Sequence, residues 1–225
     1  MAIRKILQTR TPELWTVAFS LVEILVAVAI LAILLALGVP AIFSALQRGE
    51  RAQAMSAMRS LGLGINLYSA DHSGKFVGPL WPGQVTEYDR GRAGRLVRDL
   101  ANYLDIEDRT PPYVVNRFLS PAARRVLPGV AAKDIRAYVM NMAVPVSGGV
   151  LSPWGSLAAQ PPSEPVPGSV LAGASGRTWA LSEAYQSHPA VSPSWRMNTP
   201  PRPVHGNAPL GLFFDGSVSF FDPTK

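Results

Sequence analysis

Residues 19–43 form an almost unbroken apolar run, FSLVEILVAVAILAILLALGVPAIF, in which Glu23 is the only charged residue. A helix needs about 20 apolar residues to cross the roughly 30 Å hydrocarbon core of a bilayer, so the run is long enough to span a membrane. We predict a membrane-spanning helix over 19–43, preceded by a short basic segment over 1–18. The remaining residues, 44–225, suit one globular domain.

Three interpretations of the apolar run are open. A secretory signal peptide has an apolar core of about 7–15 residues followed by a small-residue cleavage site, but this run is longer and no clear site follows it. A plain signal anchor would tether a periplasmic domain. Neither accounts for Glu23, because a carboxylate deep in a membrane helix costs on the order of 2.5–3.5 kcal/mol and usually has a partner. At the membrane edge this cost falls, so a tolerated interfacial Glu23 is the alternative.

The third interpretation rests on a motif. The sequence AFSLVE, residues 18–23, resembles the cleavage and methylation site of type IV prepilins and type II secretion pseudopilins. The resemblance implies that a prepilin peptidase cuts between Ala18 and Phe19, which makes the preceding segment a leader, and that the new amine is methylated. Glu23 and Pro40 then occupy the fifth and twenty-second mature positions, where this family has Glu and Pro. The match departs from the family at Ala18, where Gly is usual.

The resemblance implies a role for two residues of the run. In an assembled bundle, the Glu23 carboxylate of one subunit pairs with the Phe19 amine of its neighbour, which relieves a buried charge and sets the axial register. Pro40 has no amide hydrogen, so we expect it to kink or locally melt the helix.

The helix is predicted to continue beyond the apolar run. Between residues 44 and 69 the apolar side chains recur mostly at steps of three or four, which places them on one face of a helix. They are Leu46, Met55, Met58, Leu61 or Gly62, Ile65 and Tyr68. We predict that the helix extends to about Ala70 and that Gly74 ends it.

The middle of the chain carries weaker signals. Leucines four residues apart predict a short helix over 95–104, and β-prone runs predict strands within 135–142 and over 178–183. Segments rich in Gly, Pro and Ser predict loops, and they are 77–94, 144–173 and 184–204.

The strongest local fold signal is the run LGLFF-DG-SVSFF over 210–221. Asp-Gly between two β-prone runs is typical of a type I′ hairpin, in which both turn residues, here Asp215 and Gly216, have positive φ. Val218 and Phe220 alternate with serines, which predicts one buried face. We therefore predict an α+β, type IV pilin-like fold, with a long N-terminal transmembrane helix packed on a small antiparallel sheet of three or four strands.

A second resemblance involves both ends of the domain. His205, nine intervening residues and Asp215-Gly216 are similar to a C-terminal signature of planctomycete pilin-like proteins, and residues 60–76 are similar to the stretch after the anchor in planctomycete and verrucomicrobial relatives. These relatives often have a second His where Ser217 stands. Two interpretations of His205 are open: a pair or metal site with Asp215, or a contact that pins its loop to the hairpin.

Composition limits the chemistry. The chain has no cysteine, which excludes disulfides and thiolate metal sites. Its net charge of +6 comes from scattered basic residues, so we expect no nucleic-acid binding. There is no nucleophile elbow or phosphate loop, and we expect no enzyme activity. Major type II pseudopilins bind calcium near the C-terminus, which makes Asp215 and Asp222 calcium candidates, joined by Asp71 and Glu183 only if the fold brings them near; no other cofactor is expected.

The expected function is that of a structural subunit of a type II secretion pseudopilus or a type IV pilus-like filament. Its expected partners are the prepilin peptidase, copies of itself and other pseudopilins or pilins, the inner membrane and the secretion-system assembly platform. The basic leader favours a cytoplasmic start and a periplasmic domain. The alternatives are a single-pass anchored periplasmic module for ligand binding or adhesion, and a minor pilin at a filament tip.

Overall fold

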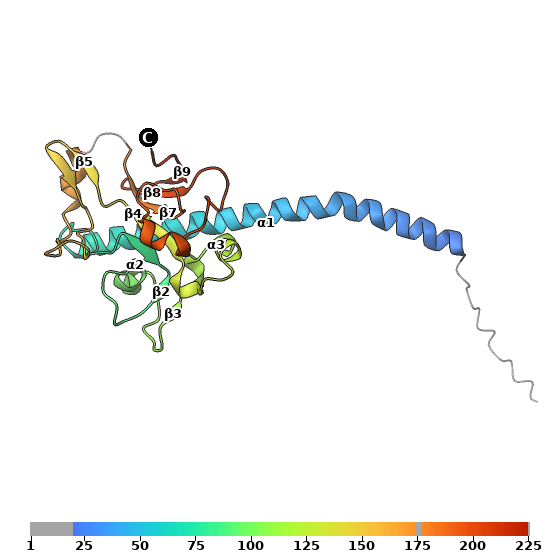
Figure 1. The fold of residues 1–225 in the computed structure, drawn as a ribbon, viewed down its shortest axis with the longest axis horizontal. Coiled ribbons are helices and arrows are strands. Elements are labelled where there is room, and N and C mark those ends of the chain that lie inside the picture. Colours follow the sequence, from blue (N-terminus) through green and yellow to red (C-terminus); the bar gives the residue numbers. More distant parts are fainter. Residues whose placement is uncertain (1–19, 174–176, 225) are drawn as a thin grey trace, which may run out of the picture. The chain divides into compact units, whose positions relative to one another are not determined.

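One long helix begins the fold (Figure 1). The computed structural model describes residues 20–173 and 177–224, and the chain divides into two compact units, residues 1–45 and 46–225. Helix α1, Leu21–Asp71, supplies residues to both units. The prediction of a continuous helix that ends near Ala70 is therefore confirmed.

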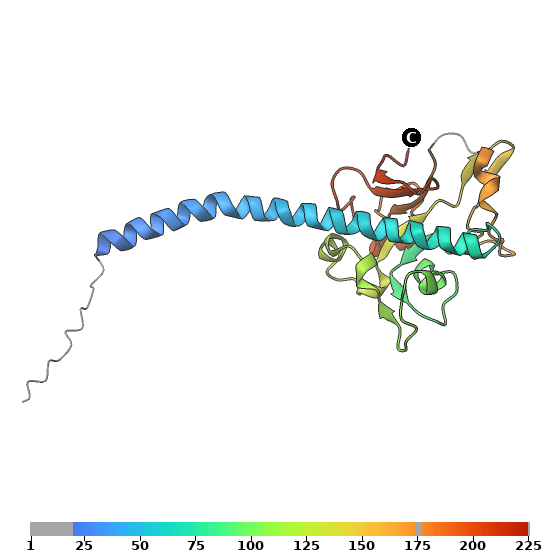
Figure 2. The same ribbon diagram turned by 180° about the vertical axis from the view of Figure 1, so that it is seen from behind.

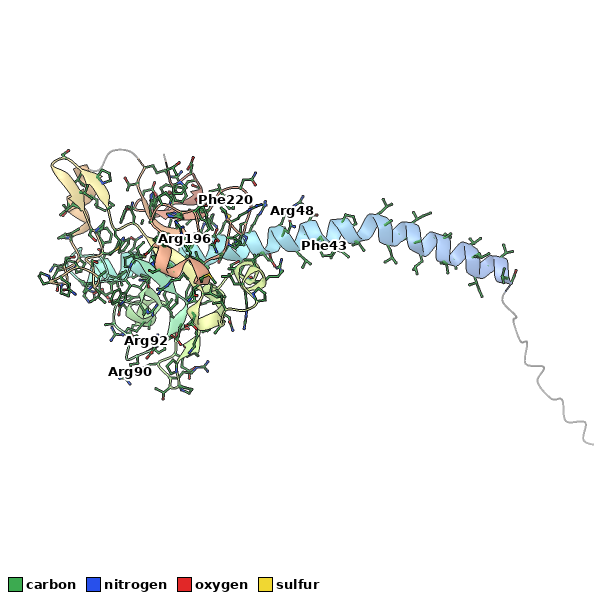
Figure 3. All side chains as sticks on the ribbon, in the orientation of Figure 1. Phe43, Arg48, Arg90, Arg92, Arg196 and Phe220 are labelled. Carbon is green, nitrogen blue, oxygen red and sulfur yellow. The ribbon has the colours of Figure 1, made fainter. Side chains whose placement is uncertain are left out.

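In the first unit, the described chain consists of Ser20 and the first part of α1. Its side chains project outward around the helix (Figure 3), and Phe43, for example, is 61% exposed. Leu and Ala, which recur throughout this segment, are among the best helix formers. A helix also satisfies the interior backbone hydrogen bonds within the segment itself, which is the condition for a chain that faces an apolar solvent.

The end of α1 follows from local backbone geometry. Ser73 and Gly74 both have positive φ, 54° and 79°. The Gly74 N–H donates to the carbonyl of Ser69 at 2.8 Å. A left-handed residue just past the last turn satisfies carbonyls that would otherwise lack a donor. The predicted stop at Gly74 is confirmed.

The second unit is built around an antiparallel sheet with the strand order β1-β4-β7-β8-β9. Its strands are β1 Gly83–Val85, β4 Arg136–Met140, β7 Trp179–Glu183, β8 Leu210–Phe213 and β9 Val218–Phe220. Two further strand pairs are β2 Glu87–Tyr88 with β3 Tyr113–Val114, and β5 Val144–Val146 with β6 Gly149–Leu151. The remaining helices are α2 Leu96–Asp99 and α3 Pro121–Val126, with 3-10 segments η1 Ala101–Tyr103, η2 Asn116–Phe118, η3 Ala132–Asp134, η4 Gly168–Gly173 and η5 Pro193–Asn198.

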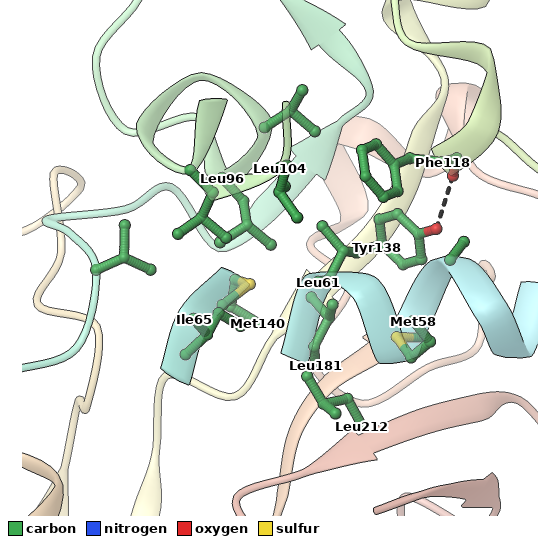
Figure 4. Packing of buried hydrophobic residues seen from close by; sticks show 14 of the residues in the cluster. Met58, Leu61, Ile65, Leu96, Leu104, Phe118, Tyr138, Met140, Leu181 and Leu212 are labelled. Carbon is green, nitrogen blue, oxygen red and sulfur yellow. Dashed lines mark hydrogen bonds between the residues drawn. The ribbon is translucent and has the colours of Figure 1, made fainter. Parts of the chain in front are cut away.

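The core lies between the last part of α1 and the sheet, which Figure 2 shows from behind. Met58, Leu61 and Ile65 are at most 4% exposed and step along one face of the helix. In Figure 4 they lie in the same cluster as Leu181 of β7 and Leu212 of β8. The predicted α+β class, a long helix packed on a small antiparallel sheet, is confirmed, with five strands in the sheet rather than three or four.

Two segments predicted as loops contain strands. β1 and β2 fall within 77–94, and β5 and β6 fall within 144–173. Each has three residues or fewer, and β1 pairs with β4 more than 50 residues later in the chain, as in Gly83 opposite Val139. Such short strands are stabilised by pairing with distant strands, so no local sequence pattern predicts them. The helix predicted over 95–104 is divided into α2 and η1.

β8 and β9 confirm the predicted hairpin but not its turn. The Gly216 N–H donates to the carbonyl of Phe213 at 2.9 Å, which closes a four-residue turn. Gly216 has a φ of 81°, whereas Asp215 is not among the described non-glycine residues with positive φ. A three-residue loop that ends on a left-handed glycine is a common hairpin connection, so the type I′ prediction is wrong.

Two apolar residues that were predicted to face the core are exposed. Leu46 is 59% exposed, and the first buried residue of α1 is Ala57, so the helix meets the core later than predicted. Phe220 is 41% exposed. It lies on β9, an edge strand with a single neighbour, so burial on that strand is incomplete.

Two leucines on α1 allow a matched test of this packing. Leu61 is fully buried, whereas Leu63, two residues later on the same helix, is 61% exposed. We expect Leu61→Ala to lower the free energy of unfolding by about 2–5 kcal/mol, because it leaves a cavity. Leu63→Ala should change it by less than about 0.5 kcal/mol. Denaturant unfolding of the detergent-solubilised chain, followed by tryptophan fluorescence, measures both; equal losses would contradict the assigned helix face.

Candidate functional site

The residues predicted for processing and assembly belong to the start of the chain. Ala18 and Phe19, the predicted cleavage site, lie outside the residues that the structure describes. Glu23 lies in the first turn of α1, and Pro40 lies inside the same helix.

Ser20 and Glu23 cap the start of α1. The Ser20 N–H donates to Oε2 of Glu23 at 2.8 Å, and the Val22 N–H donates to the Ser20 hydroxyl oxygen at 3.3 Å. This is a capping box, in which a Ser and a Glu three residues later satisfy two amides that lack helical partners. The Ser-x-x-Glu spacing in the sequence indicates such a cap. The role predicted for Glu23 from the sequence was intermolecular and did not include the cap. The carboxylate also stabilises the helix through the macrodipole.

The first part of α1 has an apolar surface on all sides. Every residue over 21–47 is exposed except Gly38, which is partly covered. Removing one Leu, Ile or Val side chain from water is worth about 1.5–3 kcal/mol, so this surface strongly favours an apolar environment. Within the part of the chain that the structure describes, α1 is the one helix long and apolar enough to cross a membrane, judged by length and composition.

Pro40 does not interrupt α1. The helix is continuous from Leu21 to Asp71, so the local melting proposed at Pro40 is not observed. Pro40 offers no amide hydrogen, which leaves the carbonyl of Ala36 without its usual helical donor. One turn later, the Ser44 hydroxyl donates to the carbonyl of Ala41 at 2.9 Å. The kink stays a prediction.

His205 does not contact the hairpin turn. Its Nε2 atom lies 3.2 Å from the Ser120 hydroxyl oxygen and 3.3 Å from Oε1 of Glu183. Ser120 immediately precedes α3, and Glu183 ends β7, so His205 joins its loop to a helix and to the sheet. His205 and Glu183 are 5% and 6% exposed. The polar partners of His205 among the described residues are therefore Ser120 and Glu183 rather than Asp215.

The cluster does not have the geometry of a nucleophilic triad. Serine and acid meet the same ring nitrogen of His205, whereas a catalytic histidine receives them on opposite nitrogens. The adjoining cavity has a volume of about 20 Å³, close to that of a single water. Ser120, Glu183 and Tyr138 contribute to its walls. The arrangement is a polar link between three segments of the unit.

Burial controls the charge in this cluster. It raises the pKa of Glu183 to about 7, against the opposing effect of the Leu210 amide, which donates to Oε2 at 3.0 Å. It also lowers the pKa of His205, on which Glu50 and Arg51 of α1 act in opposite directions. Desolvation disfavours the charged form of each group. Burial therefore favours the neutral forms of both Glu183 and His205 over an ion pair between them.

Asp215 and Gly216 shape the hairpin turn. The Ser217 N–H donates to Oδ1 of Asp215 at 2.8 Å, and Arg177 lies 3.8 Å from Oδ2. Hydrogen bonds from Ser217 lower the pKa of Asp215, because they favour its charged form. The Thr224 N–H donates to Asp222 at 3.0 Å.

Calcium remains a prediction at these acids. Among the described residues, no three His, Asp or Glu side chains come close enough together to hold a metal ion. Glu183, one of the acids considered, is engaged in the buried cluster with His205. Calcium takes six or more oxygen ligands, a number that Asp215 and Asp222 do not supply by themselves.

The chain matches no protein-family model, no curated protein and no solved structure. Its function is therefore argued from two features of its own geometry: the exposed apolar helix with Glu23 in its first turn, and the buried cluster around His205. Sequence reasoning named Glu23 and His205 but did not assign Ser20 or Ser120 to either feature.

The Glu183 cluster predicts a pH dependence of stability. Because burial raises the pKa of Glu183 from 4.5 to about 7, stability is highest below about pH 4.5 as far as this group is concerned. It falls as the pH rises through 7, by on the order of 3 kcal/mol. We expect Glu183→Gln to lack this loss, so its free energy of unfolding should rise relative to the parent chain across that window.

Chemical denaturation at several pH values measures this difference. His188, whose pKa burial lowers to about 4, contributes the same dependence to both proteins, so the difference reports on Glu183 together with its contact to His205. Glu107→Gln, at an exposed acid, is the matched control and should track the parent chain. Parallel stability curves for the parent and Glu183→Gln would show that Glu183 titrates normally.

Proposed function

We propose that this chain is a structural subunit of a type II secretion pseudopilus or a type IV pilus-like filament. The observation that carries the proposal is the first part of α1: an apolar helical surface, exposed on all sides, with Glu23 as its single charged residue. Lipid covers such a surface before assembly, and the helices of other subunits cover it afterwards. The proposed role is mechanical and includes no catalytic step.

The proposed register between subunits depends on the first turn of α1. The capping box uses one carboxylate oxygen of Glu23 for the Ser20 amide, and no basic side chain of the described residues pairs with the charge. Cleavage before Phe19 would create a positive amine, and the amine of a neighbouring subunit would pair with Glu23. Such a pair is favourable in an apolar bundle only when both partners are present and well placed.

The proposed life of the subunit has two stages. A prepilin peptidase removes residues 1–18 while the helix is anchored in the inner membrane with the second unit in the periplasm. The assembly platform then moves the subunit into a filament with copies of itself and other pseudopilins or pilins. A helix that remains solitary in the membrane would instead favour an anchored binding or adhesion module.

Processing is the first testable step. We expect mass spectrometry of the chain co-expressed with an active prepilin peptidase to find a mature N-terminus at Phe19 carrying an added methyl group. Ala18→Gly, which restores the usual family residue, should be cleaved at least as fast. A catalytically inactive peptidase is the control. Retention of residues 1–18 by both chains, with a known prepilin cleaved in the same cells, would contradict the proposal.

The association of subunits through Glu23 is the second testable step. Two differently tagged copies should purify together, and we expect Glu23→Ala to reduce their association at least tenfold, since tenfold corresponds to only about 1.4 kcal/mol. Glu23→Gln, which keeps a hydrogen-bonding side chain but not the charge, should lose nearly as much. Glu107→Gln is the matched control at an exposed acid of the second unit. Unchanged association of both Glu23 variants would rule out the pairing.

A further inference from the structure

Exposed arginines gather where the chain enters the second unit. We call this group the arginine collar, and its members are Arg48, Arg51, Arg124, Arg125 and Arg202. It draws on three segments: the start of the unit in α1, the last turn of α3 and the loop that precedes β8.

Contacts within the second unit bring the first four arginines together. Arg125 forms an ion pair with Glu50 of α1, which brings the last turn of α3 against the helix. Arg51 is the next residue after Glu50, and Arg48 precedes Arg51 by three positions, so the two share one side of α1. Arg124 is the neighbour of Arg125 and is exposed.

The loop that carries Arg202 lies against the same part of α1. A Cβ atom added at Gly206 would come within 3.6 Å of Nη2 of Arg51. The contact between His205 and Ser120 also ties this loop to the start of α3. The buried cluster therefore has a second consequence, because it holds the loop of Arg202 beside the other collar residues.

The collar is strongly positive. Over the described segments 46–53, 120–126 and 200–206, Glu50 is the only acidic residue, so five arginines less one glutamate leave a net charge of +4. Guanidinium groups bind phosphate oxygens through paired hydrogen bonds, and they keep their charge at any physiological pH. The chemistry of the collar suits phosphate-bearing anions.

The position of the collar along the chain identifies its ligand. Arg48 follows Phe43, the last residue of the apolar run, by five positions on a continuous helix, or roughly 7.5 Å at 1.5 Å per residue. The headgroup layer of a bilayer extends about 5–8 Å beyond the hydrocarbon on each side. Arg48 is therefore the first basic residue after a run long enough to span a membrane, where basic residues interact with anionic lipid.

We propose that the arginine collar binds the anionic headgroups of phospholipids in the membrane that α1 spans. This inference rests on the proposed membrane anchoring and adds a lipid partner for the second unit. Basic residues close to a membrane each strengthen binding to anionic lipid by roughly fivefold. Anionic lipid would hold the unassembled subunit at the bilayer surface, and high salt would weaken that hold.

The test uses the full chain in nanodiscs that contain phosphatidylcholine and phosphatidylglycerol. Native mass spectrometry of the released protein gives the ratio of the two lipids retained. We expect the parent chain to retain phosphatidylglycerol preferentially. In the triple variant Arg48→Gln, Arg51→Gln and Arg124→Gln, this preference should fall at least tenfold. Lys at the same three positions should keep most of the preference.

A matched control removes the same charge elsewhere. Arg90, Arg92 and Arg109 are exposed arginines around β2 and β3, and Figure 3 shows Arg90 and Arg92 well away from Arg48. Their replacement by Gln should leave the lipid ratio unchanged. An equal loss in this control would mean that net charge, and not the collar, selects the lipid. Displacement of phosphatidylglycerol by an equal concentration of inorganic phosphate would overturn the headgroup assignment.

Membrane insertion is measured separately, by resistance of the chain to alkaline extraction from vesicles of the same lipids. Extraction of the parent chain would overturn both the proposed anchoring and the collar. Firm insertion with equal retention of the two lipids would overturn the collar alone and leave the proposed function standing.

Discussion

A single helix, α1, faces two environments, and the rest of the molecule follows from that division. One face of its last part, which includes Met58, Leu61 and Ile65, packs against the sheet and is removed from water by the protein itself. Its earlier residues, from Leu21 onward, expose apolar side chains on all sides. The hydrophobic effect acts equally on both parts, so the exposed part favours an apolar environment, as the proposed anchoring supposes.

Polar side chains stabilise two parts of the molecule, the start of α1 and the interior of the second unit. At the start of the apolar helix, where amides lack partners, the Ser20 N–H donates to Glu23 and the Val22 N–H donates to Ser20. In the second unit, His205 contacts both Ser120, just before α3, and Glu183 of β7. Burial favours the neutral forms of Glu183 and His205, whereas the arginines of the collar lie exposed at the surface of the unit.

The sequence was informative where a signal is local. The period of Met58, Leu61 and Ile65 predicted the buried helix face, and Asp-Gly between β-prone runs predicted the hairpin. It did not predict features that depend on residues distant in the chain. β1 is three residues long and is stabilised by pairing with β4, and Ser120 is 85 residues away from His205. The Ser20–Glu23 cap depends on a local pattern and was predictable from the sequence. The resemblance to prepilins instead implied an intermolecular partner for Glu23.

The central claim is that copies of this chain associate along the first part of α1. The chain has no cysteine, so single substitutions such as Val26→Cys, Ile30→Cys and Ile33→Cys report only on the helix that carries them. We predict that oxidation in membranes yields disulfide-linked dimers whose abundance varies along the helix with a period of three to four residues. Dimers equally scarce at every position, in cells that process the chain, would contradict the account.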